Sequence, residues 1–350
     1  MLLRKQNNRP NNFVPSAKTT TYDTPRAVER SDACQIRDNR YLKDNENPML
    51  GGPMAKNVVA NNMPQVTLPN GDVVPALGEG TWYLGEDPAV HDRELESLVR
   101  GYEAGLTLID TAEMYGEGAA EVLLGDAMRK IMADHTRDEL YVISKVYPWN
   151  AGRDHIFDCC RASLDRMGIE QMDLYLHHWR EGDVPLAETV ACLEELREQG
   201  LIRAWGVSNY DVADMEELFS IPGGENCQIN QVLYHMGSRG IEFDLIPWMR
   251  EHNVTLMSYC PLAQAGRLRE GLMDSPVLAQ IAQKHDATIQ QVLLAWNIRD
   301  GHTITAPRTG RAAHAESNAA AARVHLDDAD LAAIDEAFPP PTHKMPLDSE

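Results

Sequence analysis

From Met63 onward, the sequence repeats one unit eight times: a short run of β-branched and apolar residues, a polar turn, and an amphipathic helical stretch. The expected strands are Gly78–Tyr83, Thr107–Thr111, Tyr141–Val146, Met172–Trp179, Ile202–Asn209, Cys227–Tyr234, Thr255–Pro261 and Thr303–Pro307. The expected helices are Glu94–Ala104, Glu121–Met132, Ile156–Met167, Pro185–Glu198, Ala213–Phe219, Asp244–His252, Pro276–Arg299 and Arg311–Ala322. Strands that alternate with helices form parallel sheets, and eight such units close into a barrel. The pattern therefore predicts the α/β class, as a (β/α)8 TIM barrel.

Two further segments lie outside the eight units. Gln65–Leu68 and Val73–Val74 flank Asn70-Gly71, a dipeptide that favours a tight turn, so we expect an N-terminal β-hairpin that plugs the barrel bottom. Ala329–Ala337 predicts an extra C-terminal helix. An open doubly wound sheet is the main alternative architecture, but about 280 residues without an internal linker favour one barrel domain.

Residues 1–62 differ from the rest of the chain. They hold ten Asn, scattered Pro and Gly, and no sustained apolar period. Such a segment buries too little apolar surface to offset the entropy cost of ordering it. We therefore expect a disordered N-terminal extension over residues 1–62 and a single barrel domain over residues 63–350. Residues 1–62 hold 10 Lys and Arg and 6 Asp and Glu, a formal charge of +4. The remaining residues carry −25, which gives the chain its net charge of −21.

Composition excludes several classes of protein. The acidic balance argues against a nucleic-acid partner, and no stretch approaches the roughly 20 apolar residues that a membrane span needs. Residues 1–10 lack the apolar core of a secretory signal. The six cysteines lack paired spacing, which suits reduced thiols rather than disulfides or a metal site. We expect a cytoplasmic monomer that acts on a small molecule, without a metal and without nucleic-acid or membrane partners.

The segment Gly116–Glu121 has the spacing of a dinucleotide-binding glycine loop, because it follows a strand and opens a helix. Its last position is a glutamate, where close packing of helix against strand needs Gly or Ala. We therefore interpret it as an ordinary loop rather than a Rossmann site.

Polar residues at the C-terminal ends of barrel strands are the first candidates for chemistry. Four of them stand out, namely Asp110, Tyr115, Lys145 and His178. Each alone has a structural alternative, as a cap acceptor, a rim aromatic, a strand-end lysine or a packed histidine. Together they form a set in which an ammonium lowers the pKa of a tyrosine, a carboxylate balances the ammonium, and an imidazole orients a carbonyl. Such a set protonates an oxygen while a hydride arrives at carbon.

Several motifs then resemble the aldo-keto reductase family. Those that carry the four residues are Thr107–Gly116, Ile143–Val146 and Asp173–Trp179. Those that continue the likeness are Leu201–Asn209, Asn230–His235, Ser258–Leu262 and Ile304–Arg308. The resemblance covers Met63 to the C-terminus, and Gly80–Tyr83 and Lys145–Gly152 are similar to bacterial members described as methylglyoxal reductases.

The resemblance implies a role for each of the four residues. Tyr115 is the proton donor, Lys145 lowers its pKa, Asp110 is the counterion of the lysine, and His178 orients the carbonyl. His177 and His178 point to opposite sides of their strand because side chains alternate along it. The motif register selects His178, which leaves His177 with a structural role.

The resemblance also implies a nicotinamide dinucleotide that lies across the barrel top, with NADPH favoured over NADH. The implied cofactor-binding residues are Ser208, Asn209, Gln231, Tyr259, Leu262, Arg308, Thr309, His314 and Asn318. Arg308 stands where many members have lysine, and its guanidinium suits a 2′-phosphate. The start of the expected helix Arg311–Ala322 is a further place for an anion.

Three tryptophans at or just beyond strand ends, Trp82, Trp149 and Trp179, are expected to form the substrate pocket, although such aromatics also serve packing alone. An apolar pocket with a polar floor suits small aldehydes and dicarbonyls, and Gln264–Ser275 is a candidate flap over it. The resemblance implies an NADPH-dependent reductase of aldehydes and α-oxoaldehydes such as methylglyoxal. The alternatives are an alcohol dehydrogenase that works in the reverse direction, and a cofactor-binding regulatory or scaffold subunit.

Overall fold

A closed eight-stranded parallel barrel forms the centre of the computed structural model, which describes residues 55–58, 63–263 and 271–349. The strands are β3 (Glu79–Gly80), β4 (Leu108–Asp110), β5 (Tyr141–Val146), β6 (Met172–His177), β7 (Ile202–Ser208), β8 (Ile229–Leu233), β9 (Thr255–Tyr259) and β10 (Thr303–Thr305). They pair in chain order, and parallel bridges Leu77–Thr305 and Gly80–Arg308 join the two outermost strands. The predicted TIM barrel is therefore confirmed, and the open sheet is wrong.

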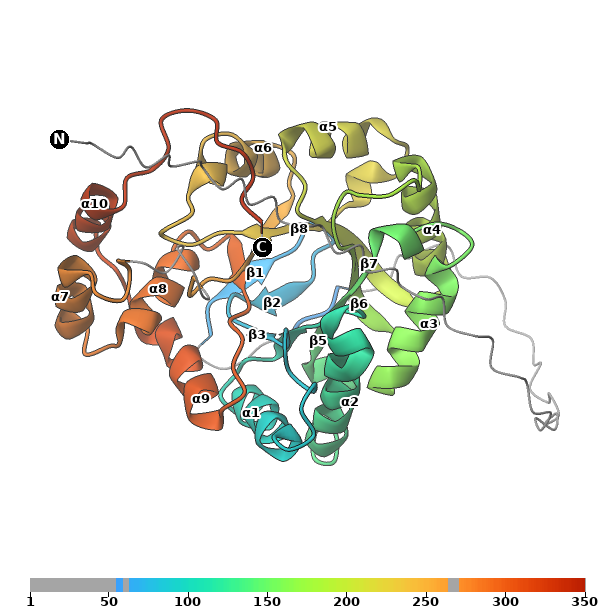
Figure 1. Ribbon diagram of the computed structural model, residues 1–350, viewed down its shortest axis with the longest axis horizontal. Coiled ribbons are helices and arrows are strands. Elements are labelled where there is room, and N and C mark those ends of the chain that lie inside the picture. The colour runs from blue at the N-terminus through green and yellow to red at the C-terminus, as the bar shows by residue number, and fades with distance from the viewer. Residues whose placement is uncertain (1–54, 59–62, 264–270, 350) are drawn as a thin grey trace, which may run out of the picture. The chain divides into compact units, whose positions relative to one another are not determined.

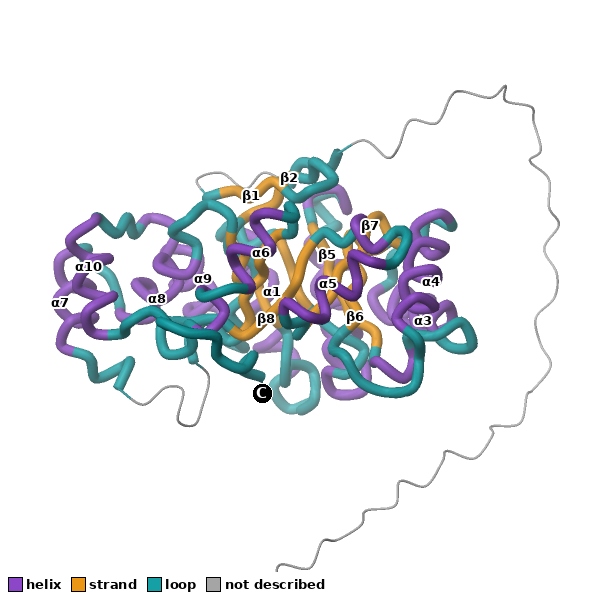
Figure 2. The backbone as a smooth tube through the Cα atoms, turned by 90° about the horizontal axis from the view of Figure 1, so that it is seen from above, coloured by secondary structure: helices purple, strands orange, loops and turns teal. Residues whose placement is uncertain are grey.

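Helices surround the strands, as Figures 1 and 2 show. They are α1 (His91–Glu103), α2 (Ala119–Ile131), α3 (Ile156–Met167), α4 (Leu186–Glu198), α5 (Val212–Ser220), α6 (Leu245–Glu251), α7 (Pro276–Lys284), α8 (Ile289–Asn297), α9 (Ala312–Ala320) and α10 (Asp328–Ala337). The predicted C-terminal helix is confirmed as α10. None of these described helices is long and apolar enough to cross a membrane.

The single helix predicted over Pro276–Arg299 is wrong, because the structure divides it into α7 and α8. The chain turns at Asp286, whose φ of +50° is left-handed. Thr288 then begins a new helix, since its hydroxyl accepts a hydrogen bond from the backbone N–H of Gln291. A threonine followed three residues later by glutamine is a helix-start signal, and here it outweighs the continuous apolar period.

Side chains along each barrel strand point alternately into the barrel and out toward the helices. The inward apolar side chains share one buried cluster, which includes Leu108, Ile143, Leu176, Ile229 and Met257. The outward side chains pack under the helices in a second cluster, which includes Ile109, Val142, Tyr175, Val207 and Val232. The next inward position on a strand, two residues beyond the apolar inward residue, lies at the C-terminal mouth of the barrel. Polar side chains are tolerated there.

The N-terminal hairpin closes the opposite end of the barrel. Strands β1 (Gln65–Thr67) and β2 (Val73–Pro75) pair antiparallel, with Val66 opposite Val74, and both valines belong to the inward cluster. The backbone N–H of Asn70 at the hairpin turn donates to Gln228 Oε1, just before β8, at 2.7 Å. The predicted hairpin and its place at the barrel bottom are confirmed.

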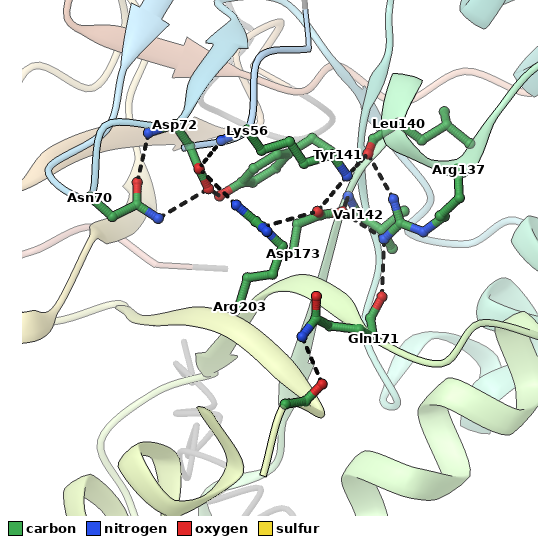
Figure 3. A network of polar contacts seen from close by, with 11 residues as sticks. Lys56, Asn70, Asp72, Arg137, Leu140, Tyr141, Val142, Gln171, Asp173 and Arg203 are labelled. Carbon is green, nitrogen blue, oxygen red and sulfur yellow. Dashed lines mark hydrogen bonds and ion pairs between the residues drawn. The ribbon is translucent and has the colours of Figure 1, made fainter. Parts of the chain in front are cut away.

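A buried ion cluster at this end includes residues that precede the hairpin (Figure 3). Asp173 Oδ1 pairs with Lys56 Nζ at 2.6 Å, and its Oδ2 pairs with Arg137 at 2.6 Å. Arg203 bridges this carboxylate to Asp72, with a 3.1 Å contact to Asp72 Oδ1. Lys56 belongs to residues 1–62, which were expected to be disordered, yet residues 55–58 contact the barrel. Residues 1–54 and 59–62 lie outside the described residues.

Glu79 is a buried acid between the barrel and α1. Both of its carboxyl oxygens are buried, and neither has a hydrogen-bond partner among the described residues. The side chain lies over Gly101 of α1, where any Cβ atom would collide with it. Burial raises the pKa of Glu79 well above 4.5, because a charged carboxylate is disfavoured without water or a partner.

We expect the unfolding free energy of the Glu79→Gln variant to rise relative to that of the parent protein as the pH increases. Because its pKa is raised, Glu79 keeps its proton in the folded protein, whereas the unfolded chain loses this proton above pH 4.5. The unfolding free energy of the parent therefore falls as the pH rises above 4.5. The variant has no such proton, and between pH 5 and pH 8 it should gain about 1 to 3 kcal/mol relative to the parent. Urea unfolding of both proteins at the two pH values measures this difference. An equal difference at both would contradict it.

Candidate active site

Lys145 contacts two of the other three residues that the sequence singled out, Asp110 and Tyr115. Its Nζ donates to Asp110 Oδ1 at 2.8 Å, to Asp110 Oδ2 at 2.9 Å, to the Thr111 carbonyl at 2.8 Å and to the Tyr115 hydroxyl at 3.1 Å. Asp110 and Lys145 occupy the last inward positions of the neighbouring strands β4 and β5. The lysine is fully buried, so its charge is balanced by the carboxylate rather than by water.

Tyr115 reaches this pair from the loop that follows β4. The next residues turn sharply, with left-handed φ values of 58° at Gly116 and 91° at Gly118, before α2 begins. The glycine segment is therefore a turn that positions the tyrosine, in agreement with its interpretation as an ordinary loop. The Tyr115 hydroxyl faces Lys145, and its ring lies edge-on to His178 at a centroid distance of 5.9 Å.

The pKa of Tyr115 shifts in the opposite direction from the sequence prediction. Burial and the negative charge of Asp110 raise the pKa of Tyr115 well above 10. The ammonium of Lys145, which is paired with the Asp110 carboxylate, does not outweigh these two effects on the pKa of Tyr115. The tyrosine is consequently protonated throughout the neutral range, while Lys145 remains close enough to stabilise negative charge that develops on its oxygen.

The two adjacent histidines point to opposite sides, as strand alternation predicts. His178 lines the cavity at the barrel mouth, whereas His177 faces outward and lies 2.7 Å through Nδ1 from the Tyr210 hydroxyl. Burial, Lys145 and His177 lower the pKa of His178 well below 6.5, so its ring is neutral at physiological pH. A neutral imidazole donates one hydrogen bond and is a poor proton source, which leaves Tyr115 as the acid.

A cavity of about 230 Å³ opens above these residues. Its lining residues are Trp82, Met114, Tyr115, His178, Trp179, Ser208, Asn209, Gln231 and Tyr259. Met114 is a lining residue that sequence reasoning missed, although its place just before Tyr115 was a usable signal. Trp149 does not line the cavity: its side chain is 50% exposed and stacks on Tyr147 outside Trp179.

The polar floor of the cavity is a connected hydrogen-bond network. Gln231 Nε2 donates to Asp110 Oδ1 at 2.9 Å, and the Ser208 hydroxyl donates to the Gln231 carbonyl at 2.8 Å. The Tyr259 hydroxyl donates to Asn209 Oδ1 at 2.9 Å. The structure therefore brings these four expected cofactor-binding residues together beside the Asp110–Lys145 pair.

A second cavity, of about 320 Å³, lies at the start of α9. Three of the expected cofactor-binding residues, Arg308, Thr309 and His314, line it. Arg93, the carboxylate of Glu94 and Arg311, which had not been assigned a binding role, line it as well. Cations beside a helix N-terminus form an environment that suits a phosphate group. The guanidinium of Arg308 also donates from Nε to the Trp82 carbonyl at 2.7 Å, which ties this site to the wall of the first cavity.

Two expected cofactor residues line neither of these two cavities. Leu262 is half-buried against the apolar core, and Asn318 is buried within α9. The candidate flap falls largely on residues 264–270, which lie outside the described residues. No group of three or more His, Cys, Asp or Glu side chains in the described part of the chain could hold a metal ion.

The fold and this constellation define a class of protein: a barrel oxidoreductase with a tyrosine acid, a lysine–aspartate pair and a neutral histidine. A family model for the aldo/keto reductase family matches residues 76–338. The chain therefore belongs to the aldo/keto reductase family.

Individual relatives support this assignment. Methylglyoxal reductase YeaE of Escherichia coli K12 is 49% identical over 280 residues, which cover 80% of this chain and 96% of that protein. Methylglyoxal reductase DkgB of E. coli O157:H7 is 31% identical over 265 residues, which cover 75% and 92% of the two chains. The crystal structure of an aldo/keto reductase from Klebsiella pneumoniae in complex with NADP and acetate has a TM-score of 0.79 and 45% identity, covering 82% of this chain and 100% of that one.

Proposed function

We propose that this protein reduces small aldehydes and α-oxoaldehydes, such as methylglyoxal, to alcohols with NADPH. The observation that carries the proposal is the contact of a buried, charge-paired Lys145 with the hydroxyl of Tyr115 on the floor of a 230 Å³ cavity. Relatives with 49% and 31% identity are methylglyoxal reductases, and K. pneumoniae relatives of known structure bind NADP and NADPH. The cavity suits a carbonyl compound of few atoms.

The residues of the cavity have different roles in the reduction of a carbonyl substrate. His178, neutral and donating, orients the carbonyl oxygen toward Tyr115. Tyr115 gives its proton to that oxygen, and Lys145 at 3.1 Å stabilises the phenolate that remains. Ser208, Asn209, Gln231 and Tyr259 would hold the nicotinamide, and Trp82 and Trp179 exclude water. NADPH, when bound, supplies the hydride that the carbonyl carbon receives.

The protonation state of Tyr115 determines how the rate in each direction depends on pH. Burial and Asp110 keep the pKa of Tyr115 well above 10, so the group carries the proton that reduction consumes. Alcohol oxidation requires the deprotonated tyrosine instead, so its rate should rise with pH. The dehydrogenase direction is the second candidate: it uses the same residues in reverse, and the cellular cofactor ratio and the pH separate the two directions.

We propose NADPH rather than NADH because the second cavity gathers Arg308, Arg311 and His314 at the start of α9. Arg308→Ala should raise the Kd of NADPH about 10- to 100-fold, the usual effect of losing a charge-assisted hydrogen bond, and change the Kd of NADH by less than threefold. Titration of tryptophan fluorescence with each cofactor measures both constants. Arg308→Lys, which keeps the charge, is the control, and equal losses for the two cofactors would refute the phosphate role.

The direct test of the function is NADPH oxidation by the purified protein in the presence of methylglyoxal. Loss of the near-ultraviolet absorbance of NADPH and formation of the corresponding alcohol are the expected results. Binding of NADPH without turnover of any small aldehyde would instead favour the regulatory or scaffold subunit. We further propose that the protein is cytoplasmic and monomeric. Analytical ultracentrifugation, which measures the mass in solution, tests the monomeric state.

A further inference from the structure

The substrate cavity presents no cationic anchor among the described residues. Its lining contains aromatic, amide, hydroxyl and thioether side chains, but neither lysine nor arginine. Lys145 lies beneath the floor, fully buried and paired with Asp110. Arg308 lies in the second cavity. Within the described part of the chain, a carboxylate on a substrate would therefore meet no lysine or arginine at the cavity wall.

The indole N–H of Trp179 is already engaged by an acid. Trp179 Nε1 donates to Glu181 Oε2 at 2.8 Å. An indole carries a single N–H, so this hydrogen is unavailable to a substrate anion. The carboxylate of Glu181 is therefore bonded to a residue that lines the cavity and that packs against His178, with their ring centroids 4.8 Å apart.

The neighbouring charges do not cancel Glu181. Arg180 is engaged elsewhere, by Glu217 at 2.9 Å and Asp214 at 3.8 Å. On the other side of the aromatic wall, Glu117 Oε1 accepts a hydrogen bond from the Tyr147 hydroxyl at 3.3 Å, and Tyr147 packs edge-on to Trp179. Two carboxylates are thus bonded to Trp179 and to its neighbour Tyr147, although neither carboxylate itself lines the cavity.

We infer that Glu181 is a specificity-determining residue, which makes the cavity disfavour carbonyl substrates that carry a carboxylate or phosphate and admit neutral or cationic ones. The inference rests on the proposed carbonyl-reducing function. A substrate anion beside Trp179 would be repelled by the carboxylate that is bonded to the Trp179 indole N–H, and because Glu181 is exposed, water screens much of this repulsion. Glu181 acts through Trp179 and through its charge, without touching the reacting atoms.

Two aldehydes of matched shape test the inference: 4-carboxybenzaldehyde, an anion, and its neutral methyl ester. The parent protein should reduce the ester with the higher kcat/KM. Glu181→Gln keeps an acceptor for the Trp179 N–H and removes only the charge. The variant should raise kcat/KM for the anion about three- to fivefold relative to the ester, the size expected for one partly solvated charge. Added salt should screen the Glu181 charge and so reduce the parent's preference for the ester over the anion.

A matched control and a second measurement make the result decisive. Glu336→Gln, a change at another exposed glutamate, on α10, should leave the ratio unchanged. Binding of the two compounds to the NADPH-loaded proteins, followed by tryptophan fluorescence, reports the charge preference even without turnover. An unchanged ratio in Glu181→Gln, by rate or by binding, overturns the inference. Failure of the parent to reduce the ester, methylglyoxal or any other aldehyde overturns the proposed function instead.

Discussion

Replacement of Tyr115 by phenylalanine should lower kcat for methylglyoxal reduction about 10²- to 10⁴-fold, the contribution that a positioned general acid usually makes. The variant loses only the hydroxyl, whose contact with Lys145 Nζ is 3.1 Å. Lys145 retains its bonds to Asp110 and the Thr111 carbonyl, so the fold and the affinity for NADPH should be preserved. Steady-state rates together with a fluorescence titration of NADPH separate the two effects.

Tyr83→Phe is the matched control for this experiment. Tyr83 is an exposed tyrosine near the same mouth, and its ring stacks on Trp82 with or without the hydroxyl. Its loss should change kcat by less than threefold. His178 has a pKa well below 6.5 and is not a reserve acid, so a Tyr115→Phe protein that retained the parent's rate would refute the assignment of the proton donor.

The catalytic floor could be predicted from the sequence because it follows from strand periodicity. Each barrel strand alternates inward and outward side chains, so an apolar inward residue such as Ile143 or Leu176 places the residue two positions later at the mouth. Alternation alone shows that only one of His177 and His178 faces the mouth. The motif register selected His178, and it also supplied Tyr115, which lies in a loop whose turn at Gly116 no periodicity describes.

Features that depend on contacts between loops were not predictable in the same way. Trp149 lies in a one-turn 3-10 helix (Pro148–Asn150) beyond β5 and stacks on Tyr147, outside the cavity that its position just beyond a strand end suggested it would line. The hydrogen bond from Trp179 to Glu181 likewise depends on the path of a short loop. The direction of the Tyr115 pKa shift depended on two opposed charges and on burial, and a sequence gives neither the distances nor the solvent exposure.

Replacement of Lys145 by methionine should affect both catalysis and stability. The change leaves Asp110 buried and without its cation, and breaking a buried ion pair in this way costs about 3 to 5 kcal/mol of unfolding free energy. It also removes the ammonium that stabilises the phenolate of Tyr115, so kcat should fall at least about 10²-fold. Urea unfolding and steady-state kinetics on one preparation measure the two losses.

The double variant Asp110→Asn with Lys145→Met separates these two roles. An asparagine at position 110 can still accept the hydrogen bond from Gln231 Nε2, but it carries no charge that needs a partner. Most of the lost stability should therefore return, because replacing both members of a buried pair costs much less than removing one. Activity should not return, since nothing then stabilises negative charge on the Tyr115 oxygen. Recovery of both together would mean that Lys145 serves only to neutralise Asp110, and that Tyr115 works without its help.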